Sequence, residues 1–328
     1  MAQDSRVALR GCESEKHDTG EILATDSSRK AQNRIARRIF ADSATVRVAY
    51  RCTIPLIRPS KLTTRERGGI GKNLSEGWCL NFAVGCTHGC PFCYVDSIHK
   101  RFGVSRYGDD VLNRWGDYFM MPENLERAIE KTPWKRWKGA EVIMSSTHDP
   151  YLPQLADKTR EILERALAAG VRFCIQTRSC LVLEDLDLLT RHRDLIRLQV
   201  SIATLNAEFA RRIEPRVPPP KRRLDTIRKA KEAGLEIGVI VAPVFPPTRW
   251  NRNGWRDLRA VIRSLSAIKP HHIYGESLHA RGQNLKLVEE ALGERLVLPE
   301  GFDAAAERVF YEELAKHGLS GKWWPERS

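Results

Sequence analysis

Short apolar runs alternate with longer amphipathic segments through the middle of the sequence, and this alternation constrains the fold more than any other feature. The runs cover residues 142–144, 171–175, 195–202, 237–241 and 272–274. The segments between them carry apolar residues at helical spacing, and two of them end at Gly170 and Gly234, a residue type that commonly closes helices. Strands alternating with helices of this length predict a parallel sheet covered by helices. With a further run at 79–84, the sequence predicts an α/β fold, a partial (β/α)6 barrel of the TIM type that is open on one side.

Polar residues follow several of these runs where the strands are expected to end. Thr147 and Asp149 follow the run at 142–144, and Arg178 follows the run at 171–175. Ser201 lies at the end of the run at 195–202. The carboxyl ends of barrel strands meet on one face, where catalytic groups collect. We therefore expect these side chains to line one shared cavity.

Three cysteines, Cys86, Cys90 and Cys93, lie at C-x3-C-x2-C spacing in a loop that directly follows the apolar run at 79–84. Gly85 and Gly89 interleave with them, which predicts a tight turn. Three thiolates converging from one loop can hold three irons of a [4Fe-4S] cubane. The fourth iron is then left for a ligand that is not protein.

Two other uses of these cysteines fit less well. A disulfide framework is typical of short secreted chains, whereas this chain has 328 residues, eight cysteines and no signal peptide. A structural zinc site usually needs a second C-x2-C or an H-x3-5-H half, and the remaining cysteines supply neither. His88 lies inside the same loop and is a candidate fourth zinc ligand, so a zinc site remains the alternative.

The charge and hydropathy of the chain bear on its partners and compartment. The net charge of +13 makes a nucleic acid a candidate partner, although basic enzymes with small substrates are also frequent. No apolar run approaches the roughly 20 residues that span a bilayer, and no secretory signal opens the chain. We expect a cytoplasmic protein that does not bind a membrane.

The sequence divides into four parts. Residues 1–40 are polar and charged without sustained periodicity and predict a flexible, disordered arm. Residues 41–78 form a lead-in, residues 79–290 the barrel, and residues 291–328 a helical extension, in which Trp323 and Trp324 are expected to pack over the open edge of the barrel.

The cysteine spacing, with Tyr94 next to the last cysteine, resembles the radical S-adenosylmethionine (SAM) superfamily. Further motifs resemble its spore photoproduct lyase-like group, also labelled DNA repair photolyases. In order, these are residues 146–153 (STHDPYLP), 176–179 (QTRS), 185–189 (DLDLL), 201–204 (SIAT), 213–215 (IEP), 223–224 (RL) and 243–246 (PVFP). Each motif is weak alone, but seven in the right order are specific, and together with the cysteine loop they span residues 79 to about 247.

The resemblance implies a cofactor set and a role for each matching residue. Cys86, Cys90 and Cys93 would hold a [4Fe-4S] cluster, and Tyr94 would flank the adenine of SAM. Arg178 stands where the group has a basic residue for the SAM carboxylate, to which a guanidinium is well suited. The remaining expected SAM contacts are Ser201, Thr147 and Asp149. The family also implies an external electron donor of the flavodoxin or ferredoxin kind.

One position departs from the group. Spore photoproduct lyases carry a hydrogen-donor cysteine where this chain has Ser146, and a hydroxyl does not quench a carbon radical as a thiol does. Cys174, Cys180 and Tyr94 are the alternative donors. The resemblance thus implies a radical SAM enzyme whose 5′-deoxyadenosyl radical abstracts hydrogen from a substrate, with nucleic acid a candidate. The alternative is a nucleic-acid-binding protein with a structural metal or Fe-S site.

Overall fold

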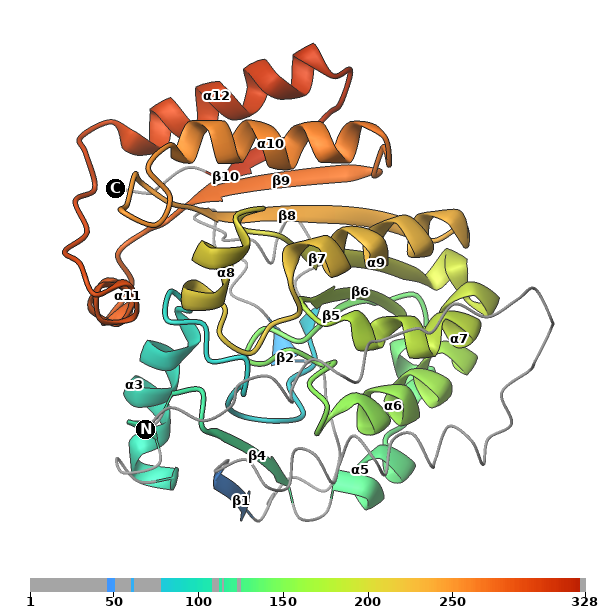
Figure 1. Cartoon of the computed structure of the whole chain (residues 1–328). Helices are drawn as coiled ribbons and strands as arrows, with labels where there is room; N and C mark the ends of the chain where they lie inside the picture. The colour runs from blue at the N-terminus through green and yellow to red at the C-terminus, as the bar shows by residue number, and fades with distance from the viewer. Residues whose placement is uncertain are drawn as a thin grey trace, which may run out of the picture.

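The fold is built on one curved, mostly parallel sheet (Figure 1). The structure is a computed structural model that describes residues 46–50, 60–61, 78–107, 112–113, 115–122 and 125–324. Within these residues, eight strands form the sheet in the order β10-β9-β8-β7-β6-β5-β3-β2. All neighbours pair in parallel except β2 and β3. The strands are β2 (Ser60–Lys61), β3 (Trp78–Cys79), β5 (Glu141–Met144), β6 (Arg172–Thr177), β7 (Ile196–Ser201), β8 (Glu236–Val244), β9 (His272–Ser277) and β10 (Lys322–Trp324).

Helices cover the outer side of the curved sheet (Figure 1). These are α6 (Ala156–Ala168), α7 (Leu186–Arg191), α9 (Pro220–Glu232), α10 (Gly254–Ser266) and α12 (Phe302–Lys316). Helix α6 ends because Gly170 takes a φ of +83°, and the N–H of Val171 then donates to the carbonyl of Ala166 at 3.0 Å, which satisfies the end of the helix. Helix α9 begins with Pro220 in its first turn, where the missing N–H costs nothing.

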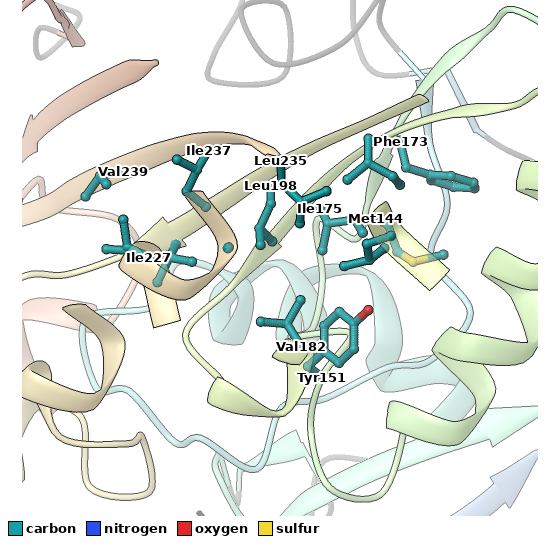
Figure 2. Packing of buried hydrophobic residues seen from close by; sticks show 14 of the residues in the cluster. Met144, Tyr151, Phe173, Ile175, Val182, Leu198, Ile227, Leu235, Ile237 and Val239 are labelled. Atoms are coloured by element: carbon teal, nitrogen blue, oxygen red, sulfur yellow. The ribbon is translucent and has the colours of Figure 1, made fainter. Parts of the chain in front are cut away.

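The main hydrophobic core lies between the sheet and these helices. Side chains at alternate strand positions point into it, among them Met144, Ile175, Leu198 and Val239 (Figure 2). Ile227 of α9 meets them from the helix layer. Full burial of a side chain of this size contributes roughly 1.5–3 kcal/mol. Burial in this core therefore determines which side of each strand faces the helices.

The opposite residues of each strand face the inside of the half-barrel. There a second cluster of buried residues is formed by Cys79, Ile143, Cys174, Ile240, Ala242, Tyr274 and Trp324. The rings of Tyr274 and Trp324 stack with centroids 4.7 Å apart. The strand β10, to which Trp324 belongs, pairs with β9 at the edge of the sheet. The C-terminal extension therefore contributes a strand as well as the helix α12.

Smaller elements complete the fold at the strand ends and at the amino-terminal side. The strands β1 (Val46–Tyr50) and β4 (Tyr118–Pro122) form a separate parallel pair. The remaining helices are α3 (Val95–Tyr107), α5 (Leu125–Lys131), α8 (Ala207–Ile213) and α11 (Asn284–Leu292), with 3-10 turns at Trp134–Trp137, Cys180–Asp185 and Arg193–Leu195.

The predicted fold class is confirmed. The six expected strands are β3, β5, β6, β7, β8 and β9, and they lie side by side in chain order. The expected run at 79–84 forms a strand only at its start, and Val84 makes an isolated bridge to Met120 instead. The expected flexible arm at 1–40 and most of the lead-in at 41–78 lie outside the described residues. None of the helices in the described ranges is long and apolar enough to cross a membrane.

Candidate functional site

The cysteine loop is shaped by its glycines and by the strand β4. Gly85 has a φ of +91°, and a Cβ there would lie 2.5 Å from the ring of Tyr118, so only glycine fits. Just before it, the main chains of Val84 and Met120 exchange two hydrogen bonds, at 3.0 and 2.7 Å. Gly89 also takes a positive φ and approaches Gly116 closely. The loop is therefore held against β4 and the turn before it.

The three thiols of this loop lie near one another and are partly or fully buried. Cys90 is buried, and Cys86 and Cys93 are half-buried. Burial raises the pKa of all three thiols, that of Cys86 to about 12. The positive charge of Arg178 acts in the other direction and lowers the pKa of Cys90 and Cys93. Among the described residues, no group of three or more His, Cys, Asp and Glu side chains is placed to hold a single metal ion.

Arg216 clamps the outside of the cysteine loop. Its Nη1 donates to the carbonyl oxygens of Thr87 and Gly116, and its Nη2 lies 2.7 Å from Asp117 Oδ1. Arg216 comes from the segment after α8, far from the loop in sequence. Its role was not predicted, because nothing in its local sequence indicates which backbone it contacts.

Asp149 organises the ends of β5 and β6. Its Oδ1 accepts hydrogen bonds from Thr177 Oγ1 at 2.7 Å and from the N–H of Tyr151 at 2.9 Å. Its Oδ2 accepts from the N–H of Arg178 at 2.7 Å and lies 3.4 Å from Nδ1 of His88. Burial lowers the pKa of His88 despite the nearby carboxylate of Asp149. Both oxygens of Asp149 are therefore engaged by protein groups, which links the strand ends to the cysteine loop.

Arg178 follows β6 and reaches over the cysteine loop. Its Nη1 donates to Glu214 Oε1 at 3.0 Å, and its Nη2 donates to the carbonyl oxygen of Ala242 at 3.1 Å. The guanidinium carbon lies 5.2 Å from the ring centroid of Phe92, between Cys90 and Cys93. Arg178 thus joins the ends of β6 and β8 to the loop, and its side chain stays 18% exposed.

The other expected SAM contacts lie around the same strand ends. Ser201 is buried at the end of β7. Thr147 Oγ1 contacts the carbonyl oxygen of Ala83 at 3.4 Å. The hydroxyl of Tyr94 donates to the carbonyl oxygen of Ser146 at 3.3 Å. The structure therefore brings Tyr94 and Thr147 to the place where the segment after β3 meets the segment after β5, beside the loop.

The candidate hydrogen donors differ in state and place. Cys174 is a free, fully buried thiol on the inner face of the barrel, where burial raises its pKa to about 12. Cys180 is in a disulfide, and its sulfur carries no hydrogen in that state. Cys79 was not predicted as a donor; its buried thiol donates to Asn81 Oδ1 at 3.3 Å beside Ser146. The signal for Cys79 was its position in the apolar run at 79–84 that leads into the loop.

A cluster of charged residues follows β9 on the opposite side of the half-barrel. His279 lies 3.4 Å from Glu276 Oε1 and 3.5 Å from Asp303 Oδ1. Arg281 pairs with Glu276 at 2.7 Å and lies over the ring of Tyr94, 5.6 Å from its centroid. Through Tyr94, this cluster is connected to the cysteine loop.

Comparisons with known proteins place this site in a family. The family model of the Radical SAM superfamily matches residues 80–252. An uncharacterized protein of Acidianus two-tailed virus is 56% identical over 278 residues, which are 85% of this chain and 92% of the viral protein. The spore photoproduct lyase of Bacillus subtilis is 23% identical over 203 residues, 61% of this chain and 54% of the lyase.

A solved structure supports the fold. It is a spore photoproduct lyase mutant with bound AdoMet and dinucleoside spore photoproduct. The match covers 94% of this chain and 87% of the lyase chain at a TM-score of 0.60, with 16% sequence identity. The lyase and this chain share the partial barrel, as the sequence predicted.

The fold and the cysteine loop define a class of enzymes built on a half-barrel. This chain belongs to the Radical SAM superfamily, and it is an enzyme. The resemblance drawn from the sequence motifs is confirmed at this level, including its spore photoproduct lyase-like relatives.

Proposed function

We propose that this enzyme holds one [4Fe-4S] cluster through Cys86, Cys90 and Cys93 and uses it to cleave SAM. The observation that carries the proposal is the position of the cysteine loop, which lies beneath Arg178 at the strand ends of the half-barrel. When bound, the cluster would supply the electron that cleaves SAM to a 5′-deoxyadenosyl radical, which abstracts hydrogen from the substrate. An external protein of the flavodoxin or ferredoxin kind would reduce the cluster.

The number of cysteines in the loop supports a cluster over a structural zinc site. A structural zinc ion takes four protein ligands, whereas three cysteines can each hold one iron of a [4Fe-4S] cubane and leave the fourth iron open. Cys90 is buried and Cys86 and Cys93 are half-buried, which limits the access of water. The guanidinium of Arg178 favours the thiolate forms of Cys90 and Cys93.

Four of the expected SAM contacts keep that role in the proposal. Arg178 has donors left for a carboxylate, since its hydrogen bonds to Glu214 and to the carbonyl oxygen of Ala242 use only part of the five N–H groups that a guanidinium carries. Tyr94 would lie beside the adenine, and Ser201 and Thr147 would contact the rest of SAM. Asp149 would act by shaping the strand ends, because both of its oxygens already accept hydrogen bonds.

The donor that returns hydrogen would come from the inner face of the barrel. Cys174 is the free thiol there that sequence reasoning named, and Tyr94 is the donor nearest to the loop. Cys79 joins them as a second inner thiol. Once a substrate is known, each cysteine would be replaced by Ser and Tyr94 by Phe. Loss of deuterium incorporation from solvent into the product would identify the donor.

The basic surface around the strand ends supports nucleic acid as the substrate class. The guanidinium of Arg212 on α8 lies 3.3 Å from the ring centroid of Trp250, and that of Arg249 lies 5.0 Å from it. Arg211 and Arg252 are exposed nearby in sequence. Binding of a fluorescent single-stranded oligonucleotide should weaken as the salt concentration rises. Replacing Arg211 and Arg252 by Ala should reduce the slope of the logarithm of the binding constant against the logarithm of the salt concentration by about two. A salt-independent affinity would argue for a small substrate.

The test of the function is anaerobic reconstitution with iron and sulfide, followed by dithionite, SAM and an assay for 5′-deoxyadenosine. The control is the triple variant Cys86→Ala, Cys90→Ala, Cys93→Ala. We expect about four irons per chain and nucleoside release, both absent in the variant. A cluster without SAM cleavage, or tight zinc binding without a cluster, would instead support the structural-site alternative.

A further inference from the structure

Glu214 is a buried carboxylate that lies between two guanidinium groups. Its Oε1 accepts hydrogen bonds from Arg178 Nη1 and Arg223 Nη1, both at 3.0 Å. Its Oε2 accepts a further hydrogen bond from Arg223 Nη2. The side chain of Glu214 is 1% exposed. These three side chains carry two positive charges and one negative charge, so one positive charge remains uncompensated within the group.

Arg223 fixes the carboxylate from the side away from the cysteine loop. Arg223 comes from α9 and is completely buried, and its Nη1 also donates to the carbonyl oxygen of Ser201 at 2.7 Å. A bidentate pair of this kind already neutralises Glu214. The pairing with Arg178 is therefore more than the carboxylate needs for its own burial.

Arg178 is the member of the group that reaches solvent, because its side chain is 18% exposed against 1% for Arg223. Glu214 holds it on one side, the carbonyl oxygen of Ala242 on another, and the ring of Phe92 lies under it. The guanidinium is thus held at the surface of the cysteine loop, with donors left over. A site of this kind suits a carboxylate.

The segment Glu214–Arg216 makes a second contact with the same loop. Next to Glu214, Pro215 lies 3.9 Å from the Cβ position of Gly89, and Arg216 donates to the carbonyl oxygens of Thr87 and Gly116. The motifs at residues 213–215 and 223–224 resembled the family, but the sequence alone assigned no function to their residues. In the structure they meet at Arg178 and at the loop.

We propose that Glu214, anchored by Arg223, is a positioning residue that holds the Arg178 guanidinium against the cysteine loop, so that its unused donors receive the carboxylate of SAM. This inference rests on the proposed function, since SAM supplies the anionic group. Glu214 itself would not touch SAM. Its effect on SAM affinity should therefore depend on Arg178 and on the ligand's carboxylate.

The experiment measures the dissociation constants of SAM and of decarboxylated SAM, which lacks the carboxylate, by equilibrium dialysis against cluster-loaded, oxidised protein. The variants are Glu214→Gln, Arg178→Ala and the double variant, and Glu208→Gln on the exposed first turn of α8 is the matched control. Loss of a charge-assisted contact should weaken SAM binding roughly ten- to hundredfold in Glu214→Gln. Binding of decarboxylated SAM should stay unchanged, and Glu214→Gln should add nothing in the Arg178→Ala background.

The outcomes separate the inference from the proposed function. Equal losses for both ligands, or losses that add in the double variant, would overturn the positioning role while leaving the enzyme's function intact. An unchanged SAM affinity in Glu214→Gln would do the same. Wild-type protein that takes up no cluster or binds no SAM would overturn the proposed function and this inference with it.

A second variant covers the case in which Glu214→Gln does not fold, because it leaves Arg223 buried without its charge partner. Replacing Glu214 and Arg223 together by Met removes both charges and keeps the volume filled, a change that buried ion pairs often tolerate. This pair should show the same selective loss of SAM binding. A Met pair that binds SAM as tightly as wild type would refute the proposal.

Discussion

The carboxylate of Asp149 at the end of β5 accepts a hydrogen bond from the main-chain N–H of Arg178 at the end of β6, at 2.7 Å. The same carboxylate accepts from Thr177 Oγ1 and from the N–H of Tyr151. Neighbouring strand ends are therefore joined through one side chain. Because Arg178 lies over the cysteine loop, the position of Asp149 affects the site without a contact to a ligand.

Replacing Asp149 by Ala should destabilise the protein strongly. The change leaves two buried N–H groups and one hydroxyl without an acceptor, and such losses together cost about 3–5 kcal/mol. The stability of Asp149→Asn should lie between that of wild type and that of Asp149→Ala, because the amide oxygen of asparagine still accepts a hydrogen bond. Urea unfolding of the metal-free protein measures the effect, with the exposed Asp194→Ala as the matched control. Equal unfolding midpoints for the two Ala variants would contradict the role of Asp149.

Replacing Arg216 by Ala should loosen the cysteine loop more than it destabilises the fold. The pair with Asp117 is exposed, with side chains 49% and 41% accessible, so it contributes less than about 1 kcal/mol. The bonds to the carbonyl oxygens of Thr87 and Gly116, in contrast, hold the loop. In the metal-free protein, alkylation of Cys86, Cys90 and Cys93, followed peptide by peptide with mass spectrometry, should be several-fold faster than in wild type.

The control for Arg216→Ala is Arg211→Ala, an exposed arginine on the preceding helix. It should leave the alkylation rates of the loop cysteines unchanged. Fully buried Cys79 and Cys174 serve as internal references in every sample. If all five thiols react faster in Arg216→Ala, the substitution has loosened the whole fold rather than the loop.

The fold was predictable because its information is local. The apolar runs at 142–144 and 237–241 are short and are separated by helical segments, and each became a strand of the sheet. The strand β10 was not predicted, because three residues give no periodicity and its pairing with β9 depends on tertiary contact.

The candidate site was predictable only in part. The glycines and cysteines of the loop lie within a few residues of one another, so their spacing carried the prediction. Glu214 and Arg223 belong to two motifs of the resemblance, but the sequence did not indicate that they contact each other and Arg178. Arg216 gave no signal, because the carbonyl oxygen of Thr87 that it contacts lies 129 positions away. Tertiary packing determines which charged residues pair with one another. A charged residue in a helix gives the same local sequence pattern whether it is buried or exposed.

Replacing Gln199 by Met should stabilise the protein. The side chain of Gln199 is fully buried on β7, and neither amide atom has a hydrogen-bond partner among the described residues. An unpaired buried amide costs about 1–3 kcal/mol, whereas Met has a similar length and no such cost. Thermal unfolding should show a rise of a few degrees, and Gln283→Met at an exposed position should show none. A fall in melting temperature would mean that the amide finds a partner in solution.

The neighbouring Gly238 sets a related expectation. A Cβ at this position would lie 2.0 Å from Gln199 Oε1, so Gly238→Ala should destabilise the protein by about 1–3 kcal/mol. Combining it with Gln199→Ala removes the clashing atoms and should recover part of the loss. Urea unfolding of the two single variants and the double variant measures the coupling, and strictly additive losses would contradict the clash.

The stability that His279 contributes should fall as the pH rises. Burial lowers the pKa of His279, but the hydrogen bond and charge of Glu276 and the hydrogen bond to Asp303 outweigh it, and the net shift is upward. A group whose pKa is raised in the folded state stabilises that state fully below its unfolded pKa of about 6.5. This contribution is lost as the pH rises through the higher folded value. The difference in melting temperature between wild type and His279→Gln should therefore be largest near pH 5.5 and shrink toward pH 8.5. Glu276→Gln should make this difference in melting temperature less dependent on pH, because it removes the main cause of the upward pKa shift. A difference that grows with pH would instead show that the imidazole of His279 is held neutral.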